Sequence, residues 1–223
     1  ELCQLNKLYV HSLVSYNRVL LQRNKLLKEL FFHPEYEGTL DVWDMQLVNY
    51  GREVIKFRRE FIKQLNEIIH AIHLSLTGGR EDISISYEPF TREDQMEDIL
   101  KKNRAQDMKQ KTTLSGPHRD DISFIVNGID IRRFGSQGQQ RTAALSLKLS
   151  ELQLVKQLSH DDPILLLDDV LSELDSSRQN HLLSAIKHIQ TMITCTGLDD
   201  FVNNRFQIDK VFKVIDGTVI NEN

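Results

Sequence analysis

The stretch ILLLDDVLSELD, residues 164–175, is an aliphatic run that ends on two aspartates. Four consecutive aliphatic residues are typical of a strand that is covered on both faces in a parallel sheet. Asp168 and Asp169 then lie at the carboxyl end of this strand, where open α/β sheets place their ligands. The stretch therefore predicts a site for the phosphates of a nucleotide, although a strand that ends in a solvated Asp-Asp turn would have the same residues.

The two aspartates suit different tasks at such a site. Asp168 would help to coordinate Mg²⁺, because a magnesium ion bound to phosphates takes only one or two protein carboxylates. Asp169 would orient or deprotonate the water that attacks the terminal phosphate. The sequence thus assigns the metal to the first acid and the catalytic role to the second.

A second stretch, FGSQGQQRTAALSLKL at residues 134–149, strengthens the nucleotide interpretation. It places small and amide side chains before a helix that we expect over residues 140–158. Backbone N–H groups near the glycines can approach an anion, and the positive end of the helix dipole points at the same place. The residues that would surround the anion are Gly135, Ser136, Gly138, Gln139 and Gln140. A glycine-containing helix start without a ligand is the alternative, and the acid-ended strand that follows makes it the weaker one.

The usual phosphate-binding loop, G-x-x-x-x-G-K-[ST], occurs nowhere in residues 1–223. The segments GTLDVWDMQ (residues 38–46) and GLDDFVNNR (residues 197–205) lack both the second glycine and the lysine. The sequence begins at Glu1 without a methionine and already within a helical pattern. We therefore expect the loop to precede Glu1 in a longer protein.

Two long amphipathic helices are expected in the first 80 residues. Apolar residues recur at spacings of three, four or seven over residues 2–27 and again over residues 43–72. The intervening segment FFHPEYEGT breaks the pattern at a proline and a glycine. The two helices should pack antiparallel, with the aromatic residues Trp43, Phe57 and Phe61 in their core.

The rest of the chain alternates strands and helices. A short strand is expected over residues 83–87, a charged helix over residues 91–108, and a hairpin that turns at Asn127-Gly128. Further expected elements are a strand over residues 164–167, a helix over residues 175–189, a strand at MITCT (residues 192–196), and two last strands over residues 211–215 and 218–220. This order predicts an α/β fold, a mixed sheet with covering helices over residues 112–223, attached to a helical arm over residues 1–111.

Two polar groups have both a structural and a functional interpretation. Four basic residues with spacings of 4, 3 and 4 form a stripe on the second arm helix: Arg52, Lys56, Arg59 and Lys63. The stripe would contact DNA phosphates, or it is a solvated helix face with charge pairs to intervening glutamates. The triplet at residues 118–120, His-Arg-Asp, is either a turn held by its own hydrogen bonds or part of a nucleotide or dimer interface.

Composition restricts the class of protein. Lys and Arg number 28 against 32 Asp and Glu, so the net charge of −4 provides no overall attraction to nucleic acid, and such binding would depend on local patches. Cys3 and Cys195 form neither a disulfide framework nor a metal site, and we expect Cys195 to be a small buried side chain. No stretch approaches the ~20 apolar residues of a membrane span, and we expect no membrane contact and a cytoplasmic location.

Several motifs together resemble the RecF family of bacterial DNA replication and repair proteins. SGPHRDD (residues 115–121), FGSQGQQRTAALSLKL and PILLLDDVLSELD (residues 163–175) occur in this order behind an arm that begins LYVHSLVSYNRVLLQRN (residues 8–24). The resemblance covers nearly the whole chain and roughly the last three-fifths of a RecF protein. It implies an ABC-type P-loop ATPase head related to the heads of SMC proteins, with a short helical arm.

The resemblance also implies roles for single residues. A site shared between two subunits would place the signature motif of one subunit over the ATP held by the other. Ser136, Gln137, Gly138, Gln139 and Gln140 match this signature motif. Asp168 matches the Walker B magnesium ligand, Asp169 stands where many ABC ATPases have a catalytic glutamate, and Ser172 and Asp175 belong to the D-loop. Thr194, Cys195 and Thr196 occupy the region where many ABC proteins have a switch histidine.

The activity that the resemblance implies is that of an ATP-dependent DNA clamp. ATP and Mg²⁺ would join two copies on duplex or gapped DNA, with slow, DNA-stimulated hydrolysis, and RecO and RecR would act with this dimer to help load RecA. Two alternatives stay open at this point. The chain could belong to a nucleotide-binding subunit of another ABC ATPase such as a transporter, or it could serve by itself as a non-catalytic interaction module.

Overall fold

The computed structural model describes residues 1–159, 162–195 and 208–222. It divides the chain into two compact units, Glu1–Asp161 and Asp162–Asn223. The first unit holds the arm and the helix that starts at the predicted signature motif. The sequence predicts a functional boundary at residues 111–112 instead, and that assignment stays a prediction. A strand on each side of this predicted boundary joins one common sheet, which explains why packing divides the chain elsewhere.

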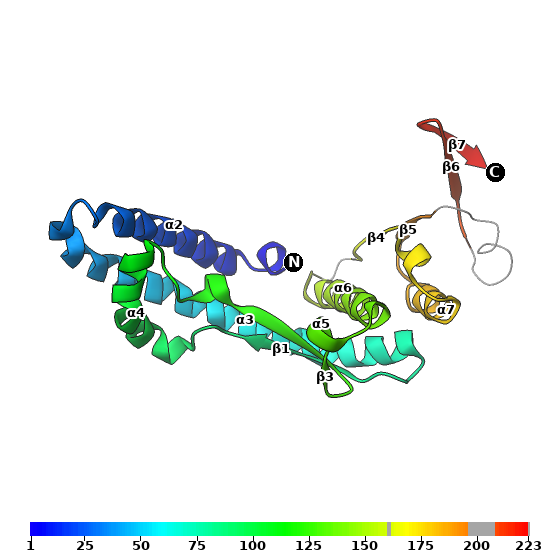
Figure 1. The fold of residues 1–223 in the computed structure, drawn as a ribbon. Coiled ribbons are helices and arrows are strands. Elements are labelled where there is room, and N and C mark those ends of the chain that lie inside the picture. Colours follow the sequence, from blue (N-terminus) through cyan, green and yellow to red (C-terminus); the bar gives the residue numbers. More distant parts are fainter. Residues whose placement is uncertain (160–161, 196–207, 223) are drawn as a thin grey trace. The chain divides into compact units, whose positions relative to one another are not determined.

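The arm begins with two helices that lie side by side (Figure 1). They are α2 (Lys7–Glu29) and α3 (Leu40–Thr77), joined through the 3-10 helix η1 (Pro34–Thr39). The prediction of an antiparallel helix pair is thus confirmed. The expected single first helix is wrong at its start, because a short helix α1 (Leu2–Leu5) ends at Asn6. The Asn6 side chain accepts a 2.9 Å hydrogen bond from the backbone N–H of Tyr9 and so caps α2.

The long helix α3 continues beyond its contact with α2, and there it packs against a three-stranded antiparallel sheet. This sheet has the order β1 (Ile83–Glu88), β2 (Asp121–Val126) and β3 (Ile129–Asp130). Asn127 and Gly128 join the last two strands with φ of 49° and 80°, the backbone of the expected tight hairpin turn. The second strand of the hairpin is only two residues long, because the chain turns at once into the short helix α5 (Ile131–Phe134).

Two further helices complete the first unit. A 3-10 turn, η2 (Glu93–Gln95), leads into α4 (Met96–Gln110), which packs against α2 and α3. The charged helix therefore starts five residues later than the 91–108 prediction. Helix α6 (Gln137–Ser159) packs along α3. In that contact the buried His73 of α3 donates a 2.8 Å hydrogen bond from Nδ1 to the Ser146 hydroxyl, which itself donates to the Thr142 carbonyl.

The core of the first unit follows α3 along its length. One cluster joins α2, α3 and α4, a second lies between α3, the sheet and α6, and a third closes the arm near η1. Trp43 and Phe57 are partly buried against the first cluster, and Phe61 is partly buried against the second. Trp43 and Phe57 thus lie at the margin of the arm core, as expected, whereas Phe61 packs against the cluster between α3, the sheet and α6 and not between the two arm helices.

The second unit is built on two parallel strands, β4 (Leu165–Asp168) and β5 (Thr191–Thr194). The 3-10 helix η4 (Val170–Glu173) and helix α7 (Ser176–Ala185) connect them, and an antiparallel hairpin of β6 (Val211–Ile215) and β7 (Thr218–Glu222) follows. Parallel strands with a connecting helix confirm the predicted α/β class. The expectation that β4 is covered on both faces is wrong for the described residues: Leu165 and Leu167 are buried, whereas Ile164 and Leu166 are 56% and 69% exposed.

Candidate nucleotide-binding site

The predicted signature motif forms the first turn of α6. The backbone N–H of Ser136 donates to the Gln139 side-chain oxygen at 3.1 Å, and the N–H of Gln139 donates to the Ser136 hydroxyl at 3.2 Å. This reciprocal pair is a capping box, which fixes the start of a helix and satisfies two of its unpaired donors. The helix therefore begins at Gln137 and not at residue 140, and the motif lies at the positive end of the helix dipole.

The exposure of the motif leaves it available to a ligand. Ser136, Gln137 and Gln140 are exposed, and Gly138 and Gln139 are partly buried. The Gln140 side chain folds back and donates to the carbonyl oxygen of Ile131 at 2.8 Å. An added Cβ on Gly135 would lie 2.5 Å from that same carbonyl oxygen, so only glycine fits before the motif.

The two aspartates of the opening stretch lie at the end of β4 beside Thr194 of β5. The Thr194 hydroxyl donates to Oδ1 of Asp168, and the backbone N–H of Asp169 donates to the Thr194 carbonyl at 3.2 Å. Asp169 has a left-handed backbone, with φ of 51°, a conformation that aspartate tolerates better than most residues. Both carboxylates are exposed. Thr194, predicted only as part of the switch region, is thus the residue that positions Asp168.

The predicted D-loop follows directly. The Ser172 hydroxyl donates to the carbonyl oxygen of Asp169 at 2.8 Å, which closes the turn of η4. Asp175 caps α7 by accepting a 3.0 Å hydrogen bond from the backbone N–H of Arg178. Both side chains therefore have a structural task, and both are exposed. Thr196 lies outside the described residues, and Cys195 is partly exposed, not buried as expected.

The His-Arg-Asp triplet joins the arm to the sheet. Asp120 accepts hydrogen bonds from the Tyr87 hydroxyl, from Arg58 at 3.2 Å and from the backbone N–H of Phe90 at 2.9 Å. Arg58 lies on α3 and also donates to the carbonyl oxygen of Pro117 at 2.6 Å. The triplet is thus a polar connection between distant segments, and not a turn held only by its own hydrogen bonds.

Comparisons with known proteins identify the family of this chain. No family model matches the chain. The DNA replication and repair protein RecF of Agathobacter rectalis is 58% identical over 219 residues, which is 98% of this chain and 60% of that protein. The RecF protein of Lachnospira eligens is 56% identical over 225 residues, 100% of this chain and 62% of its own length. The chain belongs to the RecF family.

The chain spans about 60% of the length of the RecF relatives that it matches. A solved structure of the recombination mediator protein RecF with ATP, of the RecFOR pathway, superposes with a TM-score of 0.84 at 32% identity, over 98% of this chain and 60% of that one. A second RecF structure, described as RecF-ATPrS, gives a TM-score of 0.82 at 33% identity. The fold is therefore that of part of a RecF ABC-type ATPase, and these relatives do not support the transporter alternative.

The basic stripe of this RecF chain is only partly free. Arg52 donates to the carbonyl oxygen of Glu93 at 3.0 Å, and Arg59 pairs with the carboxylate of the same glutamate at 2.5 Å. Lys56 and Lys63 are exposed, and no described residue forms an ion pair with them. The stripe therefore offers two free ammonium groups, and its two arginines hold η2 against α3.

Sequence reasoning missed a buried charge network in the RecF arm. The Arg23 side chain is fully buried and donates to Asp44 at 2.6 Å, to Asp107 at 2.7 Å and to the Thr113 hydroxyl at 2.7 Å. These partners come from α3, α4 and the segment after α4. A basic residue in the apolar stripe of α2 was the one available signal, since its partners are distant in sequence.

No described helix is long and apolar enough to cross a membrane.

Proposed function

We propose that this chain is the distal part of an ATP-dependent DNA-binding protein of recombinational repair and replication. Its membership of the RecF family supports this function, as does its likeness to a RecF structure that holds ATP. The observation that carries the proposal is the capped, exposed turn from Ser136 to Gln140 at the start of α6. A helix start of this kind binds anions through its free N–H groups.

The turn at residues 136–140 would act on ATP held by a second copy of the protein. Ser136 and Gln137 present a hydroxyl, an amide and the positive end of α6 to solvent, and an oxyanion of the γ-phosphate fits these donors. ATP would then join two copies into a dimer. Ser172 and Asp175, exposed on the loop after β4, are proposed to face the partner copy as the D-loop.

The carboxylates of β4 fit a magnesium nucleotide. When bound, Mg²⁺ would neutralise charge on the phosphates. Asp168 would hold it through the oxygen that its bond to Thr194 leaves unused among the described residues, since Mg²⁺ keeps waters and needs few protein ligands. Asp169 would orient the attacking water. Its side chain is shorter than glutamate and reaches less far, which favours slow hydrolysis and a role of ATP as a clasp.

DNA binding is proposed for the exposed side of α3. Lys56 and Lys63 are free to contact phosphates, and Arg52 and Arg59 become available if Glu93 releases them. Two copies joined by ATP would enclose duplex or gapped DNA between such surfaces. Within this proposal, RecO and RecR act with the dimer to help RecA displace the single-strand-binding protein.

Sedimentation of the whole protein tests whether ATP joins two copies into a dimer. Wild type and Ser136→Arg would be compared with and without Mg·ATP. We expect ATP to drive dimerisation of the wild type only, while both proteins bind ATP equally. A wild type that stays monomeric at saturating ATP, even with duplex DNA present, would contradict the shared site.

A further inference from the structure

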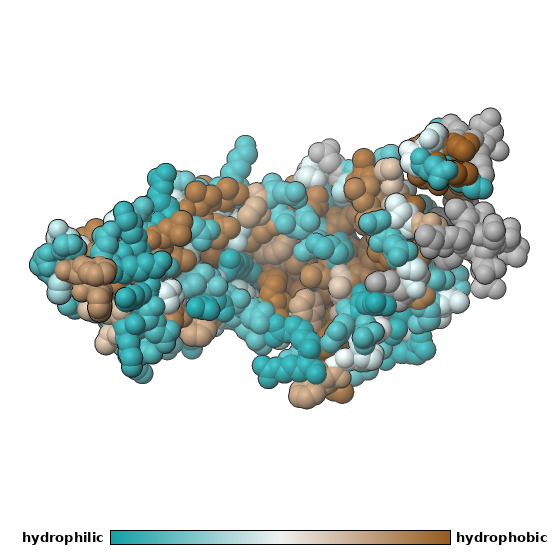
Figure 2. Space-filling view, turned by 45° about the horizontal axis from the view of Figure 1, so that its top comes forward, coloured by the Kyte–Doolittle hydropathy of each residue, from teal (hydrophilic) through white to brown (hydrophobic). Residues whose placement is uncertain are grey.

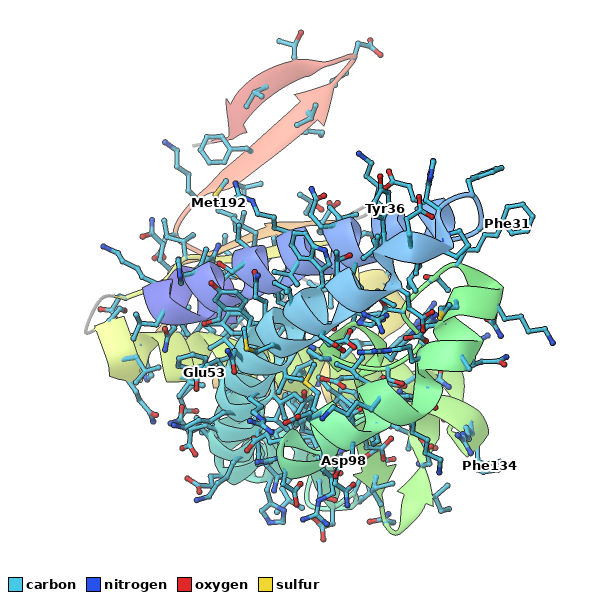
Figure 3. The ribbon with its side chains drawn as sticks, turned by 90° about the vertical axis from the view of Figure 1, so that its left-hand side faces the viewer. Phe31, Tyr36, Glu53, Asp98, Phe134 and Met192 are labelled. Carbon is cyan, nitrogen blue, oxygen red and sulfur yellow. The ribbon has the colours of Figure 1, made fainter. Side chains whose placement is uncertain are left out.

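The free end of the arm carries aromatic side chains that are largely exposed to solvent. Phe31 and Phe32 are 68% and 74% exposed, and Tyr36 is 46% exposed. The two phenylalanine rings meet edge to face, with centroids 5.1 Å apart and planes at 89°. Figure 3 views the arm from this end and shows Phe31 pointing away from the helices into solvent. In Figure 2 the same end carries brown side chains bordered by teal ones.

These aromatic residues are not needed to close the core. Leu26, Leu27, Leu30 and Leu40 already form the buried cluster at this end of the arm, and all four are at most 8% exposed. The chain then places two phenylalanines outside this cluster, in the turn between α2 and η1. Large apolar side chains that gather in solvent on a loop are typical of a binding site.

A strained lysine stands over one of these rings. Lys111 ends α4 with φ of 55°, a left-handed conformation that usually requires glycine at this position. Its ammonium group lies 4.3 Å from the centroid of the Phe31 ring, within cation–π range. A lysine in place of the favoured glycine is an outlier of the kind that accumulates at functional sites.

Charged side chains of both signs lie in the segments that carry the rings. Lys28 and Lys109 lie in the last turns of α2 and α4, and they form no ion pair with any described residue. Three glutamates lie in the same segments: Glu29 pairs with Lys25 at 3.8 Å, Glu35 contacts His33 at 3.1 Å, and Glu37 lies in η1. The lysines also complement the helix dipoles. The ammonium group of Lys111, which lies beside the Phe31 ring, nevertheless favours an anionic ligand at this place.

We propose that the arm tip, defined as Phe31, Phe32, Tyr36 and Lys111, binds single-stranded DNA. An unpaired base stacks on the exposed ring of Phe32, and the backbone phosphates on either side contact Lys28, Lys109 and Lys111. Aromatic faces beside basic groups are the means by which proteins hold single strands without sequence preference, because every base has a π-face. A base in a duplex is stacked on its neighbours and cannot reach the ring.

A protein partner fits these observations less well. A stable protein interface covers roughly 800 Å² on each side, and three rings on one turn are small by comparison. The inference rests on the proposed function only in taking DNA as the ligand. Binding of the single strand at the arm tip needs neither ATP nor a second copy. Its failure and the failure of the ATP-dependent dimer are therefore separate results.

The test uses the whole protein without nucleotide. Binding of an oligodeoxynucleotide that contains 2-aminopurine would be followed by anisotropy of a terminal dye and by quenching of the 2-aminopurine. The variants are Phe31→Ala/Phe32→Ala and Phe32→Ala alone. Val14→Ala/Leu21→Ala, which removes exposed apolar side chains from α2, is the matched control. Lys111→Gly removes the ammonium group and suits the left-handed backbone.

We expect loss of the rings to raise the dissociation constant for the single strand at least about fivefold and to abolish quenching. Duplex binding should be unchanged, and Lys111→Gly should reduce the salt dependence. The control variant should bind like the wild type. Unchanged binding and quenching in both phenylalanine variants would overturn the proposal. The arm tip would then be a contact site for a protein partner instead. Equal losses for single strand and duplex would overturn it as well.

Discussion

The Tyr16 hydroxyl donates a 2.7 Å hydrogen bond to Nδ1 of His118, a residue 102 positions later in the chain. The other ring nitrogen, Nε2, donates to the carbonyl oxygen of Thr113 at 3.1 Å. A carbonyl can only accept, so Nε2 carries a proton. Burial lowers the pKa of His118, so the imidazole is neutral at neutral pH and Nδ1 accepts from Tyr16. This contact joins α2 of the arm to the segment that leads into the sheet.

The Tyr16–His118 contact predicts a stability that depends on pH. Burial lowers the pKa of His118, with a further contribution from the positive charge of Arg119. The unfolded chain therefore takes up a proton at a higher pH than the folded one, and stability should fall as pH drops below the ordinary histidine value of about 6.5. Melting temperatures between pH 7.5 and pH 5.5 measure this loss.

The control for the pH effect is a pair of histidine variants. His118→Gln should show a smaller fall in melting temperature between the two pH values than the wild type. His11→Gln, at an exposed position on α2, should keep the wild-type fall. Identical pH profiles for all three proteins would show that His118 is not the group that titrates.

Gly135 is predicted to be irreplaceable because of the Ile131 backbone. Gly135→Ala would bring a methyl group to 2.5 Å from the Ile131 carbonyl oxygen, and we expect a loss of about 1–3 kcal/mol in unfolding free energy. Gly38→Ala is the matched control, since its added Cβ meets no atom within 4 Å. Thermal denaturation of the two variants compares them, and equal stability would refute the steric argument.

Loss of the buried Arg23 should be far more costly than loss of an exposed arginine. Arg23→Met leaves the carboxylates of Asp44 and Asp107 without their buried partner, and we expect a loss of about 3–5 kcal/mol. Arg18→Met changes an exposed residue of the same helix and should cost much less. Urea unfolding at neutral pH measures both. Similar losses of unfolding free energy would mean that the buried network contributes no more to stability than the exposed Arg18 does.

The stripe on α3 predicts two opposite effects on DNA binding. Lys56→Gln/Lys63→Gln should reduce the slope of log K against log salt by about 2. Glu93→Gln should tighten binding, because it releases Arg59 from a 2.5 Å ion pair. Lys101→Gln, on α4, serves as the control. A charge reversal at Arg52, Lys56 and Arg59 that leaves the salt slope unchanged would exclude this face as the DNA site.

Local signals in the sequence predicted most of the elements. Periodic apolar residues predict α2 and α3, and the Asn127-Gly128 pair predicts the hairpin, because these signals depend on neighbours in the chain. The small residues at 135–138 favour a turn, so the expected start of α6 is three residues late, although Ser136 and Gln139 have the spacing of a capping box. Asn6 carried a similar cap signal, and it ends the first helix.

Contacts between distant residues could not be predicted in this way. The partners of Arg23 lie 21, 84 and 90 positions away, and those of Asp120 come from α3 and β1. No local pattern encodes these pairings. The role of Thr194 beside Asp168 likewise depends on the parallel register of β4 and β5, in which these two residues are directly opposed.

ATP hydrolysis by mixed variants of the whole protein tests the shared site most directly. Ser136→Arg would lack a working signature motif, and Asp168→Asn would lack the magnesium carboxylate, so neither alone should hydrolyse ATP. A dimer of one copy of each retains one complete site, so an equal mixture should regain part of the wild-type activity that neither component has alone. A mixture as inactive as its components, under conditions in which sedimentation shows the mixed dimer, would contradict a site built from two copies.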